Sequence, residues 1–137
     1  VVKPVSGKEN PMTFSSLCWV GIGSMFGGMA RYALMACINE RTTASFPWGT
    51  FVVNVSGCLL MGLILGWFER SGSASPALRL FLAVGFCGGF TTFSTFVNDG
   101  IGLWTQPGSF MFLLYTAGSL LAGIITLWCG VQLFRSL

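Results

Sequence analysis

The chain has 137 residues, of which 53% are hydrophobic and only 8% are charged, and its formal net charge is +3. A soluble domain usually carries about 25% charged residues, so this chain cannot cover itself with a surface that is compatible with water. The composition predicts an integral membrane protein embedded in a lipid bilayer. It also excludes a nucleic-acid-binding protein, because the few basic residues form no basic surface.

The first eleven residues differ from the rest of the chain. They hold two of the seven basic residues, Lys3 and Lys8, and contain no long apolar stretch. We interpret residues 1–11 as a disordered leader or a remnant of expression and leave them out of the fold. Residues 12–137 are predicted to form one transmembrane channel domain.

Four segments are long enough to cross a bilayer, which requires about 20 mostly apolar residues. Short polar connections with proline, serine or glycine separate them, as turn chemistry requires. The sequence therefore predicts an all-α protein with four transmembrane helices, at about 14–38, 49–68, 77–103 and 109–134.

The third segment is predicted to be a broken helix. Gly88 and Gly89 disfavour a helix interior, and Thr91 and Thr92, which follow them, favour helix N-caps. We expect one half to end near Gly88 and the next to start near Thr91. Unpaired backbone groups at bilayer depth are tolerated only inside protein or beside a polar cavity, and such breaks commonly bind ions. The alternative is a glycine-rich patch for close helix packing.

The basic residues give little topological preference. Arg31 and Arg41 lie towards one membrane face, and Arg70, Arg79 and Arg135 lie towards the other. Because the positive-inside rule depends on such a difference, the chain would be permitted to insert both ways and form an antiparallel homodimer.

Small residues four apart provide surfaces for close helix approach. They occur at Gly23 and Gly27 and at Gly62 and Gly66. Two interpretations are open: these surfaces pack one subunit against another, or they pack helices within one subunit.

No catalytic or metal-binding constellation is found in the sequence. There is no histidine, no GxSxG turn and no phosphate-binding GxxxxGK[ST] loop. Asp99, the one acid within a predicted span, has no partner acid for acid–base chemistry. The five cysteines are scattered singly and are interpreted as buried small side chains. The chain is predicted not to be an enzyme and to bind no nucleotide.

Uncharged hydrogen-bonding side chains remain at membrane depth. A buried amide or hydroxyl without a partner costs about 1–3 kcal/mol, so these groups must bond to one another, to water or to a ligand. A single serine or threonine can instead bond its own helix carbonyl, whereas the amide of Asn54 offers two donors and an acceptor. The candidates for an ion pathway are Asn54, Ser94, Thr95, Tyr115 and Ser119.

Two phenylalanines extend this set. Phe93 and Phe96 are three residues apart and share a helical face. They are either core or lipid-facing residues, or they present the positive edges of their rings to an anion. Ring edges, an amide and hydroxyls bind a small anion without a fixed charge that would trap it. This set predicts an anion pathway.

Arg31 and Asp99 are expected outside the narrowest part of the pathway. Arg31 is near the end of its helix, where it either reaches the interface or concentrates anions at a vestibule. Asp99 is expected at the other mouth of the third helix, as a cap or a vestibule group, because an acid would repel an anion.

Three strings resemble the Fluc (CrcB) family of fluoride channels. They are GGFTTFSTF at 88–96, GTFVVNVSG at 49–57 and GGMARY at 27–32. The resemblance implies an antiparallel, dual-topology homodimer with two pores that passively exports fluoride from the cytoplasm across a bacterial inner membrane. The chain departs from the family at Asp99, where members often have glutamate, at Val97, where they have serine, and at Gly123, where some have a second serine.

The resemblance also assigns roles to residues. Phe93 and Phe96 match the paired phenylalanines of the fluoride path, and Asn54 matches its asparagine. Gly88 and Thr91 match positions whose carbonyls hold a structural sodium ion (Na+) at the dimer interface. The remaining matches are Ser94 and Thr95 on the hydroxyl track and Tyr115 and Ser119 on the fourth helix.

Two rival functions were weighed. A small, dual-topology, proton-coupled multidrug exporter needs a titratable acid in its first helix, where this chain has Arg31 and no acid. A structural subunit without transport would not need Asn54, the threonine-rich break and the paired phenylalanines together. The sequence favours a channel.

Overall fold

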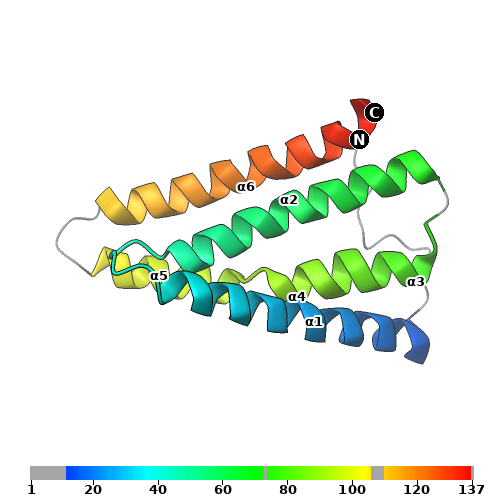
Figure 1. Ribbon diagram of the computed structural model, residues 1–137, viewed down its shortest axis with the longest axis horizontal. Helices are drawn as coiled ribbons and strands as arrows, with labels where there is room; N and C mark the ends of the chain where they lie inside the picture. The colour runs from blue at the N-terminus through cyan, green and yellow to red at the C-terminus, as the bar shows by residue number, and fades with distance from the viewer. Residues whose placement is uncertain (1–11, 73, 106–109, 137) are drawn as a thin grey trace.

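The computed structural model describes residues 12–72, 74–105 and 110–136. These residues form an up-and-down bundle of long helices, and none of them lies in a β-strand (Figure 1). The elements in chain order are α1 (Phe14–Asn39), α2 (Trp48–Ser71), α3 (Pro76–Arg79), η1 (Leu80–Cys87), α4 (Gly88–Phe90), α5 (Phe93–Trp104) and α6 (Phe110–Ser136). The predicted leader, residues 1–11, lies outside the described residues, so the proposed domain boundary remains a prediction.

Local capping explains where several helices begin and end. The hydroxyl of Thr13 accepts a hydrogen bond from the amide of Ser16 at 3.2 Å at the start of α1. Ser75 caps α3 in the same way, with Pro76 in the first turn, where proline sacrifices no hydrogen bond. At the end of α2, Gly72 adopts a left-handed conformation with φ 62°, which favours glycine.

The bundle consists of two closely packed helix pairs. α2 lies along α6, and α1 lies along η1 and α4 (Figure 1). A Cβ atom added to Gly62 would lie 2.2 Å from the carbonyl oxygen of Leu127 on α6, and one added to Gly23 would lie 2.3 Å from that of Phe81 on η1. Both small-residue motifs therefore serve packing within one subunit.

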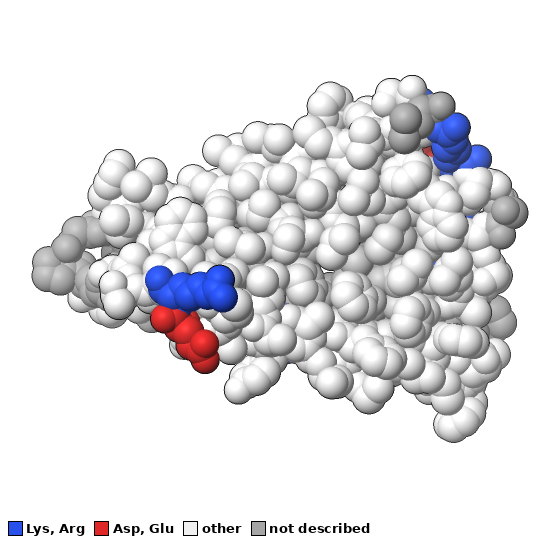
Figure 2. Space-filling view, in the orientation of Figure 1, with Lys and Arg blue, Asp and Glu red and all other residues white. Residues whose placement is uncertain are grey.

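Three helical segments are long and apolar enough to cross a membrane, counted over the described part of the chain. They are Trp48–Ser71, Pro76–Trp104 and Phe110–Ser136. With 26 residues α1 has sufficient length, but it is less apolar than the other three, so the fourth span remains a prediction. On the face shown in Figure 2, charged side chains gather near the two ends and leave an uncharged band between them. The chain is a multi-pass membrane protein.

The third segment is broken, but not where the sequence predicted. The helix continues through Gly88 and Gly89 to Phe90, and Thr91 and Thr92 are extended, with ψ angles of 159° and 118°, before α5 starts at Phe93. The expected end near Gly88 and restart near Thr91 were both wrong by about two residues. Gly89 serves close packing, because an added Cβ would lie 2.6 Å from the carbonyl oxygen of Ser24 on α1.

Before the break, η1 is a π-helix, which the sequence did not predict. Wide π turns are rare and occur often near functional sites. Here the turn accompanies a close approach of Gly85 to α1, where an added Cβ would lie 2.8 Å from the carbonyl oxygen of Val20. The hydroxyl of Ser24 donates a hydrogen bond of 3.3 Å to the carbonyl of Gly85, so α1 also supplies a donor to the widened backbone.

Candidate functional site

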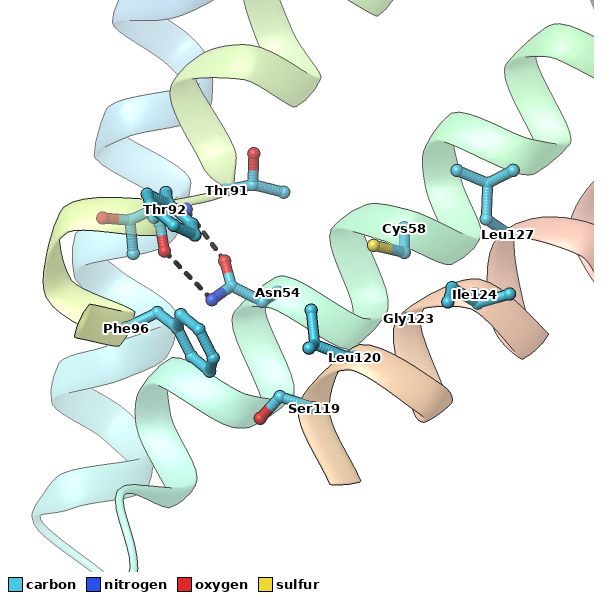
Figure 3. A pocket seen from close by; sticks show the side chains of 11 residues that line it. Asn54, Cys58, Thr91, Thr92, Phe96, Ser119, Leu120, Gly123, Ile124 and Leu127 are labelled. Atoms are coloured by element: carbon cyan, nitrogen blue, oxygen red, sulfur yellow. Dashed lines mark hydrogen bonds between the residues drawn. The ribbon is translucent and has the colours of Figure 1, made fainter. Parts of the chain in front are cut away.

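Asn54 on α2 bonds to the extended backbone at the break. Its Nδ2 donates to the carbonyl oxygen of Thr92 at 3.0 Å, and its Oδ1 accepts from the amide of Thr92 at 2.8 Å. Figure 3 shows this pair of bonds from the side chain to the extended backbone. One amide thus satisfies a donor and an acceptor that a continuous helix would have paired internally. One Nδ2 hydrogen remains for another acceptor.

The side chain of Thr92 starts the second half of the broken helix. Its Oγ1 accepts from the amide of Thr95 at 3.3 Å and donates to Oγ1 of Thr95 at 3.0 Å. The hydroxyl of Ser94, which is exposed, lies 3.5 Å from the same oxygen. This arrangement is an N-cap, and it places three hydroxyls side by side at the break.

The break also removes the helical partners of the last carbonyls before it, among them those of Gly88 and Thr91. In a continuous helix, Gly88 would accept from the amide of Thr92, and Thr91 from the amide of Thr95. Those two amides bond to Asn54 Oδ1 and to Thr92 Oγ1 instead. The carbonyls of Gly88 and Thr91 have therefore lost these helical donors.

A cavity of about 360 Å³ lies between the break, α2 and α6. Its polar groups are few and come from different elements. Asn54 faces Thr92 and Phe96, and Ser119 enters the cavity from α6 (Figure 3). Most of the remaining wall is apolar. The full lining is Asn54, Cys58, Thr91, Thr92, Phe93, Phe96, Ser119, Leu120, Gly123, Ile124 and Leu127.

Aromatic rings run from this cavity towards the start of α2. The ring centroids of Phe93 and Phe96 are 5.9 Å apart, and those of Phe96 and Tyr115 are 5.1 Å apart. Tyr115 then meets Phe46 edge to face at 5.5 Å and 86°. Phe93 is 76% exposed, whereas Tyr115 is fully buried, so the row extends from the surface of the subunit into its interior.

Two hydroxyls on α6 are buried without a hydrogen bond of ordinary geometry to a described residue. The oxygen of Ser119 makes no hydrogen bond to any described residue, and that of Tyr115 makes none of ordinary geometry, although it lies close to the side chains of Thr50 and Asp99. Each oxygen has almost no exposed surface. An unpaired buried hydroxyl costs about 1–3 kcal/mol, and such groups often mark a site for water or an ion. Because the two residues are four apart, they lie on the same face of α6.

A second cavity, of about 270 Å³ and more polar, lies where α1 ends and α2 begins. Oγ1 of Thr50 donates to Oδ2 of Asp99 at 2.6 Å within it. Thr95 also lines this cavity, and its hydroxyl bonds to Thr92, which lines the first cavity. One member of this bonded hydroxyl pair therefore lines each cavity. The other lining residues are Met35, Asn39, Thr42, Ala44, Ser45, Phe46, Pro47, Trp48 and Gly49.

Most of the predicted residues are brought together. Asn54, Phe93, Phe96 and Ser119 line the first cavity, Thr95 and Asp99 line the second, and Tyr115 contacts Phe96. Arg31 lines neither cavity and makes no hydrogen bond or ion pair with a described residue, so the subunit does not join it to the others.

Sequence reasoning missed three contributors. Thr50 is one turn before Asn54 on the same helix face, a spacing that could have indicated its role. Thr92 was identified as a capping residue, but not as a residue that lines the first cavity. Phe46 precedes α2 in a connection and has no periodicity, so no local signal could have placed its ring against Tyr115.

Comparisons with known proteins show which family the chain resembles. Residues 18–131 match the family model described as CrcB-like protein, Camphor Resistance (CrcB). A protein of Flavobacterium psychrophilum called fluoride-specific ion channel FluC is 36% identical over 122 residues, covering 89% of this chain and 98% of its own length. A protein of the same name from Nitratidesulfovibrio vulgaris is 43% identical, covering 82% of this chain and 90% of its own length. One from Chlorobium phaeobacteroides is 42% identical, covering 91% of this chain and 97% of its own length.

These relatives are named as ion channels, which confirms the prediction that the chain is not an enzyme. The family match covers the broken helix and all residues of both cavities. The resemblance expected from the three sequence strings is confirmed, and the chain belongs to the CrcB family.

Proposed function

We propose that the chain is a passive, selective fluoride channel that exports fluoride from the cytoplasm across the inner membrane of a bacterial cell. One observation supports this most directly: the unpaired, buried hydroxyls of Tyr115 and Ser119 lie beside the Asn54 cavity and the aromatic row. The name of the relatives supports fluoride as the ion.

The chemistry suits a small anion that must lose its water. Hydroxyls, the remaining Nδ2 hydrogen of Asn54 and the positive ring edges of Phe93 and Phe96 replace hydration without a fixed charge. No proton carrier is needed, and α1 contains no acid for proton coupling. The exporter alternative is therefore not favoured.

We further propose that α1 is the fourth membrane span and that two copies assemble as an antiparallel homodimer with two pores. Two features support this arrangement: the arginines are almost equally divided between the two ends of the bundle, and Phe93 of each copy is exposed for a partner to cover. In such a dimer the carbonyls of Gly88 and Thr91 would hold a structural Na+. They fit this role because they have lost their helical donors and because carbonyl oxygens at a helix C-terminus favour a cation.

Fluoride efflux from loaded liposomes, with chloride as the comparison, tests the function. We expect fast, passive fluoride efflux and far slower chloride efflux, and Phe96→Ile should suppress the fluoride signal. Phe112→Ile is the matched control, because Phe112 packs on Trp104 outside both cavities. Equal fluxes of the two anions, or no flux at all, would contradict the proposal.

The two unpaired hydroxyls provide a test that separates transport from folding. Tyr115→Phe and Ser119→Ala each remove a buried polar atom that makes no hydrogen bond of ordinary geometry to a described residue, so neither should lower the thermal unfolding midpoint in detergent. Both should reduce fluoride efflux, because each removes a donor from the path. If efflux is unchanged in both variants, the path lies elsewhere.

Sodium removal tests the metal site and the dimer together. Replacing sodium by a large organic cation should weaken dimer association, measured by size-exclusion chromatography with light scattering, and lower fluoride efflux. If neither dimer association nor fluoride efflux changes when sodium is removed, the sodium site is refuted, but the proposed fluoride path is not.

A further inference from the structure

The bundle has a net positive charge at one end and no net charge at the other. Where α2 and α6 end and α3 begins, the described residues include Arg70, Arg79, Arg135 and Glu69, which sum to +2. The opposite end holds Arg31, Glu40, Arg41 and Asp99, which sum to zero. Figure 2 shows basic side chains at the end of the bundle where the described chain finishes.

Two of the three arginines at the positive end are already engaged. Arg135 bonds to Oε2 of Glu69 through Nε at 3.0 Å and Nη2 at 2.7 Å. The guanidinium of Arg79 lies over the ring of Phe68, 5.0 Å from its centroid. Both arginines are thereby held within the subunit.

Arg70 is different, because none of the described carboxylates forms an ion pair with it. Its one hydrogen bond to a described residue joins Nη1 to the carbonyl oxygen of Phe134 at a long 3.4 Å. A guanidinium has five N–H donors, so most of them are left for an outside acceptor.

Arg70 opens onto a cavity of about 320 Å³ at the ends of α2 and α6. The other lining residues are Trp67, Ser71 and Phe134, so the cavity combines a cation and a hydroxyl with two aromatic rings. Trp67 is 39% exposed and three residues before Arg70, on the same helix face. Tryptophan at the end of a membrane span is typical of the headgroup level of a bilayer.

We propose that this cavity binds the phosphate of an anionic phospholipid, with Arg70 and Ser71 holding the headgroup and Trp67 and Phe134 contacting the upper part of an acyl chain. The charges favour this occupant. Two helix C-termini contribute about −0.5 each and the two helix N-termini at this end, of α1 and α3, about +0.5 each, so the end keeps its net positive charge. Arginine forms short, charge-assisted bonds to phosphate, and both lining helices are membrane spans whose ends lie where headgroups do.

Lipid retention by the full chain tests this site. The protein is incorporated into nanodiscs of equal parts phosphatidylglycerol and phosphatidylcholine, extracted in mild detergent, and analysed by native mass spectrometry. We expect preferential retention of phosphatidylglycerol, and Arg70→Gln should reduce it by about fivefold, the effect of one interfacial arginine. The matched controls are Arg79→Gln at the same end and Arg41→Gln at the opposite end, both of which should retain the lipid.

Three results would overturn the proposal: equal retention of the two lipids by the unaltered protein, unchanged retention by Arg70→Gln, or an equal loss in the controls. The unaltered protein gives a second measurement that is independent of variant folding. Phosphatidylglycerol should raise its thermal unfolding midpoint in neutral detergent, whereas inorganic phosphate should not. A shift with inorganic phosphate as large as that with the lipid would reassign the cavity to free phosphate.

Discussion

The helix α2 packs against its neighbours through two contacts of opposite kinds. Near its middle, Asn54 meets the broken backbone at Thr92 through two hydrogen bonds. About two and three turns later, Gly62 and Gly66 lie directly against the backbone of α6, with no side chain between them. The first contact is polar and lies beside a cavity, and the second is apolar and close-packed.

The difference shows what a break in a membrane helix requires. An unbroken helix satisfies its own backbone, so its packing depends on small residues that let two helices approach. The amide of Thr92 has no partner in its own helix, so another helix must supply an acceptor. Asn54 supplies it and also donates to the carbonyl of Thr92, and this makes its side-chain amide a structural group of the break as well as a candidate for contact with an ion.

Removing the amide should have the largest effect. Asn54→Leu leaves the amide of Thr92 unpaired, at about 1–3 kcal/mol, and removes one bond to its carbonyl, at about 1 kcal/mol, so the free energy of unfolding should fall by about 2–4 kcal/mol. Denaturant titration in detergent micelles measures this, and fluoride efflux should fall with it. Ser56→Ala on the same helix is the control, because Ser56 bonds only the Val53 carbonyl of its own helix. A loss no larger than in the control would show that the break does not depend on Asn54.

Filling the close-packed contact should have the next largest effect. In Gly62→Ala the new Cβ would lie 2.2 Å from the carbonyl oxygen of Leu127, so α2 and α6 must separate. We expect the free energy of unfolding to fall by about 1–3 kcal/mol, the usual cost of overpacking. Gly118→Ala on α6 should be neutral or stabilising, because its Cβ would meet nothing within 4 Å. Equal effects at the two glycines would disprove the close contact.

Loss of the cap at the break should have a smaller effect. Thr92→Val keeps the shape of the side chain but removes the hydroxyl that bonds the amide of Thr95, at about 1 kcal/mol for a helix N-cap. Thr92→Ser should retain most of the stability, since serine caps equally well. Thermal unfolding midpoints of the two variants provide the measurement. A serine variant as unstable as the valine variant would indicate that the methyl group, and not the cap, is important.

The smallest effect is expected within the apolar contact itself. Thr126 on α6 donates to the carbonyl of Val55 on α2 at 3.3 Å, but also to that of Ala122 in its own helix at 2.8 Å. Because the hydroxyl is satisfied locally, Thr126→Val should lower the free energy of unfolding by only about 0.6 kcal/mol, the average for such bonds between membrane helices. A loss as large as that of Asn54→Leu would remove the distinction between the two contacts.

The sequence by itself determined that the chain lies in a lipid bilayer, that it is all-α, and roughly where its helices begin and end. Composition and segment length are sufficient for this, because a bilayer permits few structures that satisfy the backbone internally. It also indicated the break and most of the cavity residues, because Thr91, Thr92 and Asn54 are costly at membrane depth unless they have a partner.

Only the tertiary structure decided which partner each group has. The break lies at Thr91 and Thr92 because Asn54 bonds to Thr92, while Gly88 and Gly89 remain helical and Gly89 fits against α1. The π turn at η1, the contact of Phe46 with Tyr115 and the unpaired hydroxyls of α6 likewise depend on residues far apart in the chain. No local pattern records such contacts, because they form only when the helices have packed.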